Sequence, residues 1–292
     1  MENPTRIALA AVVLVAAAGA LAWRASGATP SSGPVLQGLC EASTVIEDGE
    51  GFLIGDNEAE DRLFRFDANL QPAGEVRLPS EVEDIEALVP TPAGLVVVGS
   101  HSRSKKGKVR PKRHAVLALD EGRARRADLS GCEPCVAAEP RLPKEGGVSI
   151  EGAAWWRDAL WLGLRSPLDG GALLLRMRED GDVLRVDEVV RADLDGRGVR
   201  ELRVHGGVLW ILAGPATARE EPHALYVLAE PGGAPELRVA DLPSGSEGFA
   251  FVGDAAESIA AVELLVVTDG DGKPGDRCSA PATWARRSIG PS

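Results

Sequence analysis

The sequence has few aromatic residues and almost no helical patterning. Its 292 residues include one Tyr and five Phe, against six Trp. No segment after residue 24 shows a helical periodicity of adequate length, which argues against a helical domain. The 34 Gly and 20 Pro suit many short strands joined by turns. We therefore expect an all-β domain, with four of the tryptophans packed in core strands: Trp155, Trp156, Trp161 and Trp210.

Short motifs for nucleophilic or nucleotide chemistry are also missing. The chain contains no G-x-S-x-G, no H-E-x-x-H and no Walker loop, so it offers little support for a serine hydrolase, a zinc peptidase or an NTPase. The formal net charge of −12 argues against general nucleic-acid binding. We therefore expect no nucleic-acid partner.

One long apolar run occurs, at the N-terminus. Residues 7–22 are sixteen apolar residues without a charge, somewhat short for a spanning helix of about 20 residues and long for the apolar part of a signal peptide. Cleavage near residues 20–28 and an uncleaved anchor ending at Trp23 and Arg24 both stay open. Both place the remainder in the periplasm or outside the cell, either free or anchored by residues 7–23. We divide the chain into a signal peptide or anchor (1–23), a flexible linker (24–34) and one β domain (35–292).

Four cysteines in an exported chain favour disulfide bonds. Three connectivities are open to four cysteines. We favour Cys40 with Cys278, because they lie at opposite ends of the domain, and Cys132 with Cys135 as a tight local loop. A zinc site at C-E-P-C is the alternative, although no second Cys/His pair has suitable spacing.

A glutamate recurs just before a short apolar strand pattern, five times along the chain. The intervals are 45, 65, 50 and 46 residues, a period typical of stacked or radial repeats, and the β pattern inside each repeat indicates a propeller. Each repeat reads as strand, tight turn, strand, long loop, strand, turn, strand, which is one four-stranded blade. The five glutamates are Glu41, Glu86, Glu151, Glu201 and Glu247.

This repeat predicts a β-propeller of five four-stranded blades, with six possible if the long second repeat holds extra strands. The last repeat has one clear strand after its loop, around residues 283–289. Residues 34–39 could supply its missing outer strand, which would close the ring and remove free edges. A β-sandwich is the alternative architecture, but it would not require a glutamate at one phase of every repeat.

In a propeller the five glutamates would face one another around the central channel. Such a ring requires a cation, protons or a basic ligand. Hard oxygen ligands suit divalent cations, and calcium accepts about six to eight of them flexibly. We therefore predict a divalent cation, calcium first, at Glu41, Glu86, Glu151, Glu201 and Glu247, with Asp56 and Asp269 from the loops of the same face. The alternative is that the glutamates bind backbone amides and hold neighbouring blades in register.

A basic loop stands out in this acidic chain. Residues 103–113 carry seven positive charges within eleven residues. A solvated loop is one interpretation, and docking onto anionic envelope material or lipid is another. Beside a metal, basic groups would bind a phosphate or another polyanion. The predicted anion-binding residues are His101, Arg103, Lys105, Lys106, Lys108, Arg110, Arg165 and Arg200.

Several stretches resemble an uncharacterised bacterial family known as domain of unknown function 3616. They are C-E-A-S (40–43), G-S-H-S-R-S-K-K-G-K-V-R-P (99–111), S-I-E-G-A-A-W (149–155), G-L-R-S-P-L (163–168), D-L-D-G-R-G-V-R-E-L (193–202) and I-L-A-G-P (211–215). The resemblance covers roughly residues 36–275 and implies an exported β-propeller without an assigned activity. The E-G strand starts are more weakly similar to esterase-like phytase and metal-dependent lactonase propellers, which implies hydrolysis of a phosphate ester or a lactone with a divalent cation. Five blades would depart from the six usual in the lactonases.

Two functions follow from these observations. The first is an exported monomeric propeller whose funnel binds a divalent cation and, beside it, an anionic small molecule or envelope polyanion. If it is an enzyme, a metal-assisted hydrolysis of a phosphate ester is the most economical reaction. The second is a non-catalytic binding or scaffold module of the envelope, in which the glutamates connect the blades and the basic loop is a docking surface.

Overall fold

A computed structural model describes residues 33–217, 221–253, 262–270 and 278–290. The described residues fall in one compact unit, and the five buried apolar clusters lie between Leu36 and Ile289. The predicted signal peptide or anchor, and nearly all of the predicted linker, lie outside the described residues. Within the described ranges, no helix is long and apolar enough to cross a membrane.

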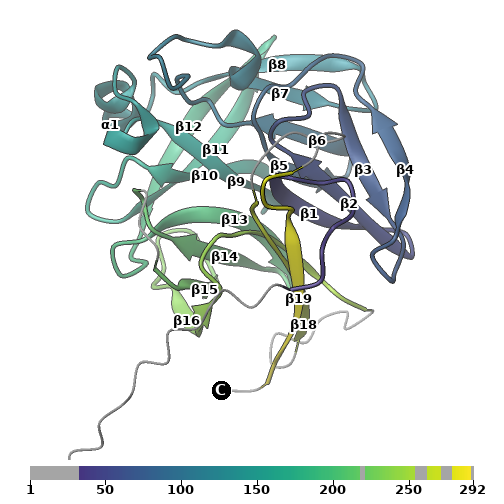
Figure 1. Ribbon diagram of the computed structural model, residues 1–292. Coiled ribbons are helices and arrows are strands. Elements are labelled where there is room, and N and C mark those ends of the chain that lie inside the picture. Colours follow the sequence, from purple (N-terminus) through teal and green to yellow (C-terminus); the bar gives the residue numbers. More distant parts are fainter. Residues whose placement is uncertain (1–32, 218–220, 254–261, 271–277, 291–292) are drawn as a thin grey trace, which may run out of the picture. The chain divides into compact units, whose positions relative to one another are not determined.

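The described strands form five consecutive antiparallel units (Figure 1). The first two units contain β1 (Ala42–Asp48), β2 (Gly51–Asp56), β3 (Arg62–Phe66) and β4 (Pro72–Arg77), then β5 (Ile85–Thr91), β6 (Gly94–Gly99), β7 (Ala115–Ala118) and β8 (Arg123–Asp128). The next two contain β9 (Ser149–Trp156), β10 (Ala159–Ser166), β11 (Ala172–Asp180) and β12 (Val183–Ala192), then β13 (Gly198–His205), β14 (Val208–Gly214), β15 (His223–Leu228) and β16 (Glu236–Leu242). The fifth contains β17 (Ser246–Phe251), β18 (Val262–Thr268) and β19 (Thr283–Ile289).

The first strand of each unit lies at the centre. β1 contacts β5, β5 contacts β9, β9 contacts β13, β13 contacts β17, and β17 contacts β1 again. This closed circle of innermost strands, each followed outward by the rest of its own sheet, is the arrangement of a β-propeller. The fold class predicted from the repeat is therefore confirmed.

The N-terminal segment closes the ring against the last unit. Val35 forms an isolated antiparallel bridge with Thr283 of β19, and the Leu36 amide donates to the Ala282 carbonyl at 2.9 Å. Leu36 and Leu39 are fully buried in a cluster with residues of β1, β2 and β18. The Cys40–Cys278 disulfide fastens the same junction. Both predicted disulfides are confirmed, and residues 34–39 do lie beside the last blade, although they pair through a single bridge.

The second and third units are joined at their outer edges. Residues 126–128 of β8 pair in parallel with residues 183–185 of β12, so that β5–β12 form one eight-stranded sheet. Helix α1 (Glu133–Ala138) and the Cys132–Cys135 disulfide belong to this region, and both cysteines are buried in the core between the two blades. This short helix was not predicted, because six residues are too few to show a helical period.

Candidate functional site: the central channel

Every innermost strand carries a β-bulge near its start. The pairing with the second strand skips one residue between Ala42 and Thr44, and the same shift recurs in β5, β9, β13 and β17. A bulge leaves one residue out of the ladder and redirects its side chain. The skipped residues are Ser43, Glu86, Glu151, Arg200 and Glu247, and we call this set the bulge ring.

The bulge ring corrects two members of the predicted glutamate ring. Glu41 lies two residues before the bulge of β1, and Glu201 lies one residue after the bulge of β13. The residues at the shared position are Ser43 and Arg200 instead. The bulge ring therefore contains three carboxylates, one hydroxyl and one guanidinium, so part of the compensating charge comes from the ring itself.

Arg200 connects three blades. Its Nη1 donates to Glu151 Oε2 of β9 at 2.8 Å and to both oxygens of Glu247 of β17 at 2.9 Å. All three side chains are largely buried, with exposed fractions of 9%, 5% and 17% for Arg200, Glu151 and Glu247. Such charge-assisted bonds are stronger than neutral ones, and here they span neighbouring blades. Arg200 was predicted to bind an anionic ligand; the structure pairs it with the protein's own carboxylates.

The pKa values of Glu151 and Glu247 are shifted in opposite directions. Burial alone would raise the pKa of Glu151, but Arg200 and Arg165 together hold it below the ordinary value. The Arg165 Nη1 donates to Glu151 Oε1 at 2.7 Å, so Arg165 too is paired within the protein. Burial raises the pKa of Glu247 to about 7, against the opposing effect of Arg200.

Glu86 is the carboxyl group of the bulge ring without a hydrogen-bond partner among the described residues. It is 9% exposed. Burial, and then the charges of Asp84, Glu151 and Glu247, raise its pKa well above the ordinary value. A buried carboxyl group with a raised pKa is held in its neutral form, which is one way to accommodate crowded carboxylates.

Arg203 lies three residues after Arg200 on β13, and its side chain occupies the centre of the ring. Its guanidinium donates to the carbonyl oxygens of Val45 (β1), Leu88 (β5) and Phe249 (β17) at 2.6–3.2 Å. It also pairs with Glu201 at 2.8 Å. One side chain thus contacts four of the five innermost strands. Sequence reasoning missed Arg203, although an arginine between Leu202 and Val204 of an innermost strand is an available signal.

Glu201 belongs to this central contact. It accepts from the Thr44 hydroxyl of β1 at 2.6 Å and from the Leu202 amide at 3.0 Å, and it is fully buried. Burial raises its pKa to about 8 despite the neighbouring Arg203. The observed role of Glu201 is therefore to bridge β13 and β1.

The loop carboxylates of the same face are arranged around backbone groups. Asp56 is fully buried and accepts from the amides of Cys40, Glu41 and Glu58 at 3.0–3.2 Å. Asp269 keeps an exposed surface, yet desolvation by the surrounding protein, and then the charges of Glu247 and Glu41, raise its pKa. Across the described ranges, no group of three or more His, Cys, Asp or Glu side chains is placed to hold a metal ion.

A further carboxylate cluster supports the basic loop. Asp84, in the left-handed backbone region with φ of 61°, accepts from the hydroxyls of Ser100 and Ser102. Arg113 contacts Asp84 at 3.0 Å and Glu83 at 3.0 Å. Sequence reasoning placed Arg113 in the basic loop of this face but did not identify Asp84 or Glu83.

Most charges of the basic loop are paired. Arg103 binds Glu139, Arg110 binds Glu83, and Lys112 contacts Glu60 and Glu81. His101 is buried and stacks on His114 with ring centroids 3.8 Å apart, and burial lowers its pKa to about 3. Lys105, Lys106 and Lys108 at the tip are exposed and form no ion pair with described residues. Of the predicted anion-binding residues, these three alone combine exposure with an unpaired charge in the described structure.

The fold and the channel define a β-propeller with an arginine–carboxylate network at its centre. Residues 140–262 match the family described as "Protein of unknown function (DUF3616)". This match confirms the resemblance predicted from the sequence over a narrower stretch than residues 36–275. No curated protein matches the chain.

Solved structures similar to the chain include hydrazine synthase of Kuenenia stuttgartiensis, with 13% identity and a TM-score of 0.41, covering 86% of this chain and 63% of that one. A luciferin-regenerating enzyme has 11% identity, coverages of 88% and 94% and a TM-score of 0.39. A streptogramin B lyase has 11% identity, coverages of 91% and 85% and a TM-score of 0.38. The chain thus spans less than two thirds of the hydrazine synthase chain.

Proposed function

We propose that this protein is an exported, non-catalytic binding propeller of the cell envelope, acting as a monomer. The observation that carries the proposal is the bonding of Arg200 and Arg203 to five strands of the ring. Their partners Glu151, Glu247 and Glu201 form these bonds between blades, so we assign them a structural role. Two disulfides suit an oxidising compartment, which supports export.

The three free lysines of the basic loop are the proposed contact with an anionic envelope polymer. Lysine is a compact, hydrated point charge that attracts polyanions without fixed geometry. The attraction must therefore weaken steeply as salt screens it. The other basic side chains of the loop fix its conformation by pairing with Glu139, Glu83, Glu81 and Glu60.

Binding of residues 33–292 to long-chain polyphosphate tests this function. The variant Lys105→Ala/Lys106→Ala should weaken binding and flatten its salt dependence, without changing thermal stability. The control Arg141→Ala/Lys144→Ala removes two exposed charges from the nearby segment and should bind like the parent. Equal binding by the two double variants would contradict a role for Lys105 and Lys106.

A second candidate, a cation-dependent hydrolase related in chemistry to phytase or lactonase propellers, is favoured by one observation. Glu86 has no hydrogen-bond partner in the described structure, and burial together with three neighbouring carboxylates raises its pKa. Glu247 acts electrostatically on both Glu86 and Asp269. A calcium ion beside these carboxylates would relieve the repulsion and supply a Lewis acid for a phosphate ester or a lactone.

Metal content and thermal unfolding before and after chelation separate the two candidates. The binding-propeller proposal predicts no stoichiometric calcium or magnesium and no change of midpoint on adding millimolar cation. Stoichiometric metal together with a chelation-sensitive midpoint that disappears in Glu86→Gln would favour the hydrolase and would justify assays with phosphate esters and lactones.

A further inference from the structure

A second cavity lies between the second and third blades, away from the channel. It has a volume of about 330 Å³ and is lined from both blades, including the β5–β6 and β9–β10 turns. Glu86 and Glu151 lie near the starts of β5 and β9, whereas these turns follow the ends of the two strands. The cavity, which we name the interblade pocket, therefore opens on the other face of the propeller.

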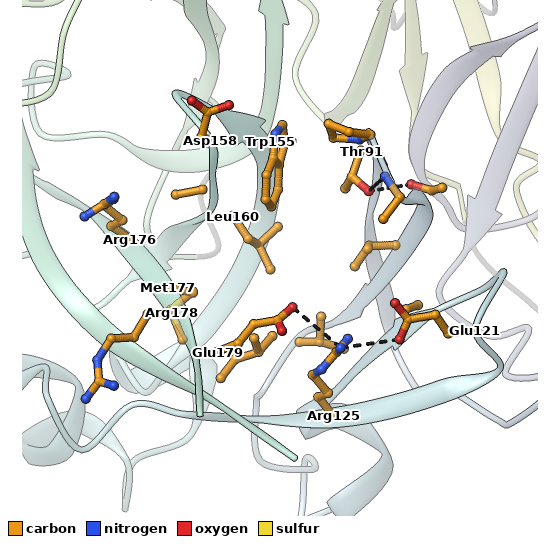
Figure 2. A pocket seen from close by; sticks show the side chains of 18 of the residues that line it. Thr91, Glu121, Arg125, Trp155, Asp158, Leu160, Arg176, Met177, Arg178 and Glu179 are labelled. Atoms are coloured by element: carbon orange, nitrogen blue, oxygen red, sulfur yellow. Dashed lines mark hydrogen bonds and ion pairs between the residues drawn. The ribbon is translucent and has the colours of Figure 1, made fainter. Parts of the chain in front are cut away.

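The floor of the interblade pocket is apolar. Leu160, Met177 and Leu184 form it and belong to the core between the two blades, while Val96 and Trp155 are partly buried at its wall. Figure 2 shows the Trp155 ring and Leu160 among the lining side chains. Small-molecule sites are concave, predominantly apolar and about 300–1,000 Å³ in volume, and the interblade pocket meets all three conditions.

The walls of this pocket are held in place by the joined outer strands. β8 pairs with β12 along residues 126–128 and 183–185, and Arg123 binds Gly181 and Asp182 of the β11–β12 turn. Since both walls belong to one continuous sheet, the cavity does not depend on a ligand to form. Preformed walls reduce the entropy cost of binding.

The rim carries three arginines and four carboxylates, and all of these except Asp158 form ion pairs within the described structure. Arg125 Nη2 lies 3.3 Å from Glu121 and 3.5 Å from Glu179, and these three residues stand together at one end of the pocket (Figure 2). Arg176 contacts Asp187 at 2.7 Å. A charged ligand would have to lose water and displace a partner from one of these pairs, which is costly. A neutral ligand would only cover apolar surface.

We propose that the interblade pocket binds an uncharged small molecule with an aromatic or aliphatic body. The apolar floor supplies the attraction, Trp155 offers a ring for stacking, and the rim, whose charges apart from Asp158 are paired, offers an ion few open partners. This site is independent of the channel and of the exposed lysines of the basic loop.

Titration of residues 33–292 with the neutral probe N-phenyl-1-naphthylamine tests the proposal by its fluorescence. Ala118 lines the pocket at the end of β7, so Ala118→Trp should fill the cavity and weaken binding at least about tenfold. The matched control Ala240→Trp places the same side chain on an exposed position of β16 and should bind as the parent does. The anionic probe 1-anilinonaphthalene-8-sulfonate should bind more weakly than the neutral one.

Val96→Trp is a second blocking variant, at a partly buried wall position, in case Ala118→Trp does not fold. Near-ultraviolet circular dichroism and the thermal midpoint establish that each variant is folded. Saturable binding of one probe per chain that is lost in a folded blocking variant supports the proposal. Absence of saturable binding, or equal binding by the blocking variant and the Ala240→Trp control, overturns it.

Discussion

Replacing Arg200 by Met should destabilise the propeller by about 3–5 kcal/mol at pH 8, the usual cost of removing one partner from a buried ion pair. Met keeps much of the apolar stem but leaves Glu247 without the guanidinium that contacts both of its oxygens. Glu151 retains Arg165 and Ser149, so most of the loss should come from Glu247.

The loss should depend on pH in a definite direction. Because burial raises the folded-state pKa of Glu247 to about 7, the folded protein binds more protons than the unfolded chain between the ordinary value and pH 7. The stability associated with Glu247 is therefore greatest at low pH and falls as pH rises toward 7. Without Arg200 the penalty for ionised Glu247 increases, so the variant should approach the parent at pH 5.

Urea unfolding of residues 33–292 at pH 5 and pH 8 measures this difference. Arg191→Met is the control, since Arg191 pairs with Asp169 at an exposed site, and it should change stability by less than about 1 kcal/mol. Adding Glu247→Gln to Arg200→Met should recover part of the loss at pH 8. A loss below about 1 kcal/mol for Arg200→Met, or no recovery in the double variant, would refute the assignment of Arg200 as a buried connection between blades.

Three further predictions concern the ring. Cys40→Ser should lower the free energy of unfolding by about 2–5 kcal/mol, because the lost disulfide spans 238 residues, whereas Cys132→Ser opens a loop of three and should cost less in the same urea assay. Glu86→Gln should raise the urea midpoint more at pH 8 than at pH 5, because the stability associated with a carboxyl group of raised folded-state pKa falls progressively as pH rises above the ordinary value. A lower midpoint at pH 8 would contradict this. Gly152→Ala should lower the thermal midpoint, since its Cβ would lie 2.8–3.0 Å from the β13 backbone and force the blades apart; an unchanged midpoint would show that the blades can shift freely.

The fold was predictable because the hydrophobic pattern within each repeat is local. Strand, turn and strand recur with a polar residue at each change of direction, and the paired β-strands follow one another in sequence. The parallel contact between β8 and β12 was not predictable, since it joins segments 57 residues apart (Arg126 with Val183) that carry no shared motif. Helix α1 was not predictable, because it is too short to show a helical period in the sequence.

The types of residue in the channel were predictable, but two positions of the ring were assigned to the wrong residues. A bulge adds one residue to a strand, so aligning glutamates by letter alone placed Glu41 and Glu201 where Ser43 and Arg200 stand. The countercharges were harder to foresee, because Arg165 and Arg200 have the same chemistry whether they bind an external phosphate or an internal carboxylate. Distance and burial decide that choice, and neither is written in the residue types.

The closure between residues 34–40 and residues 278–284 has a consequence for the order of assembly. Within each blade the strands are neighbours in sequence, so a chain that becomes available from its N-terminus onward can build its sheets one after another. The contact of β1 with β17, the Cys40–Cys278 bond and the Val35–Thr283 bridge all require the last unit of the chain, between β17 and β19. Until that unit is available, the first blade has an open flank and the circle cannot be completed.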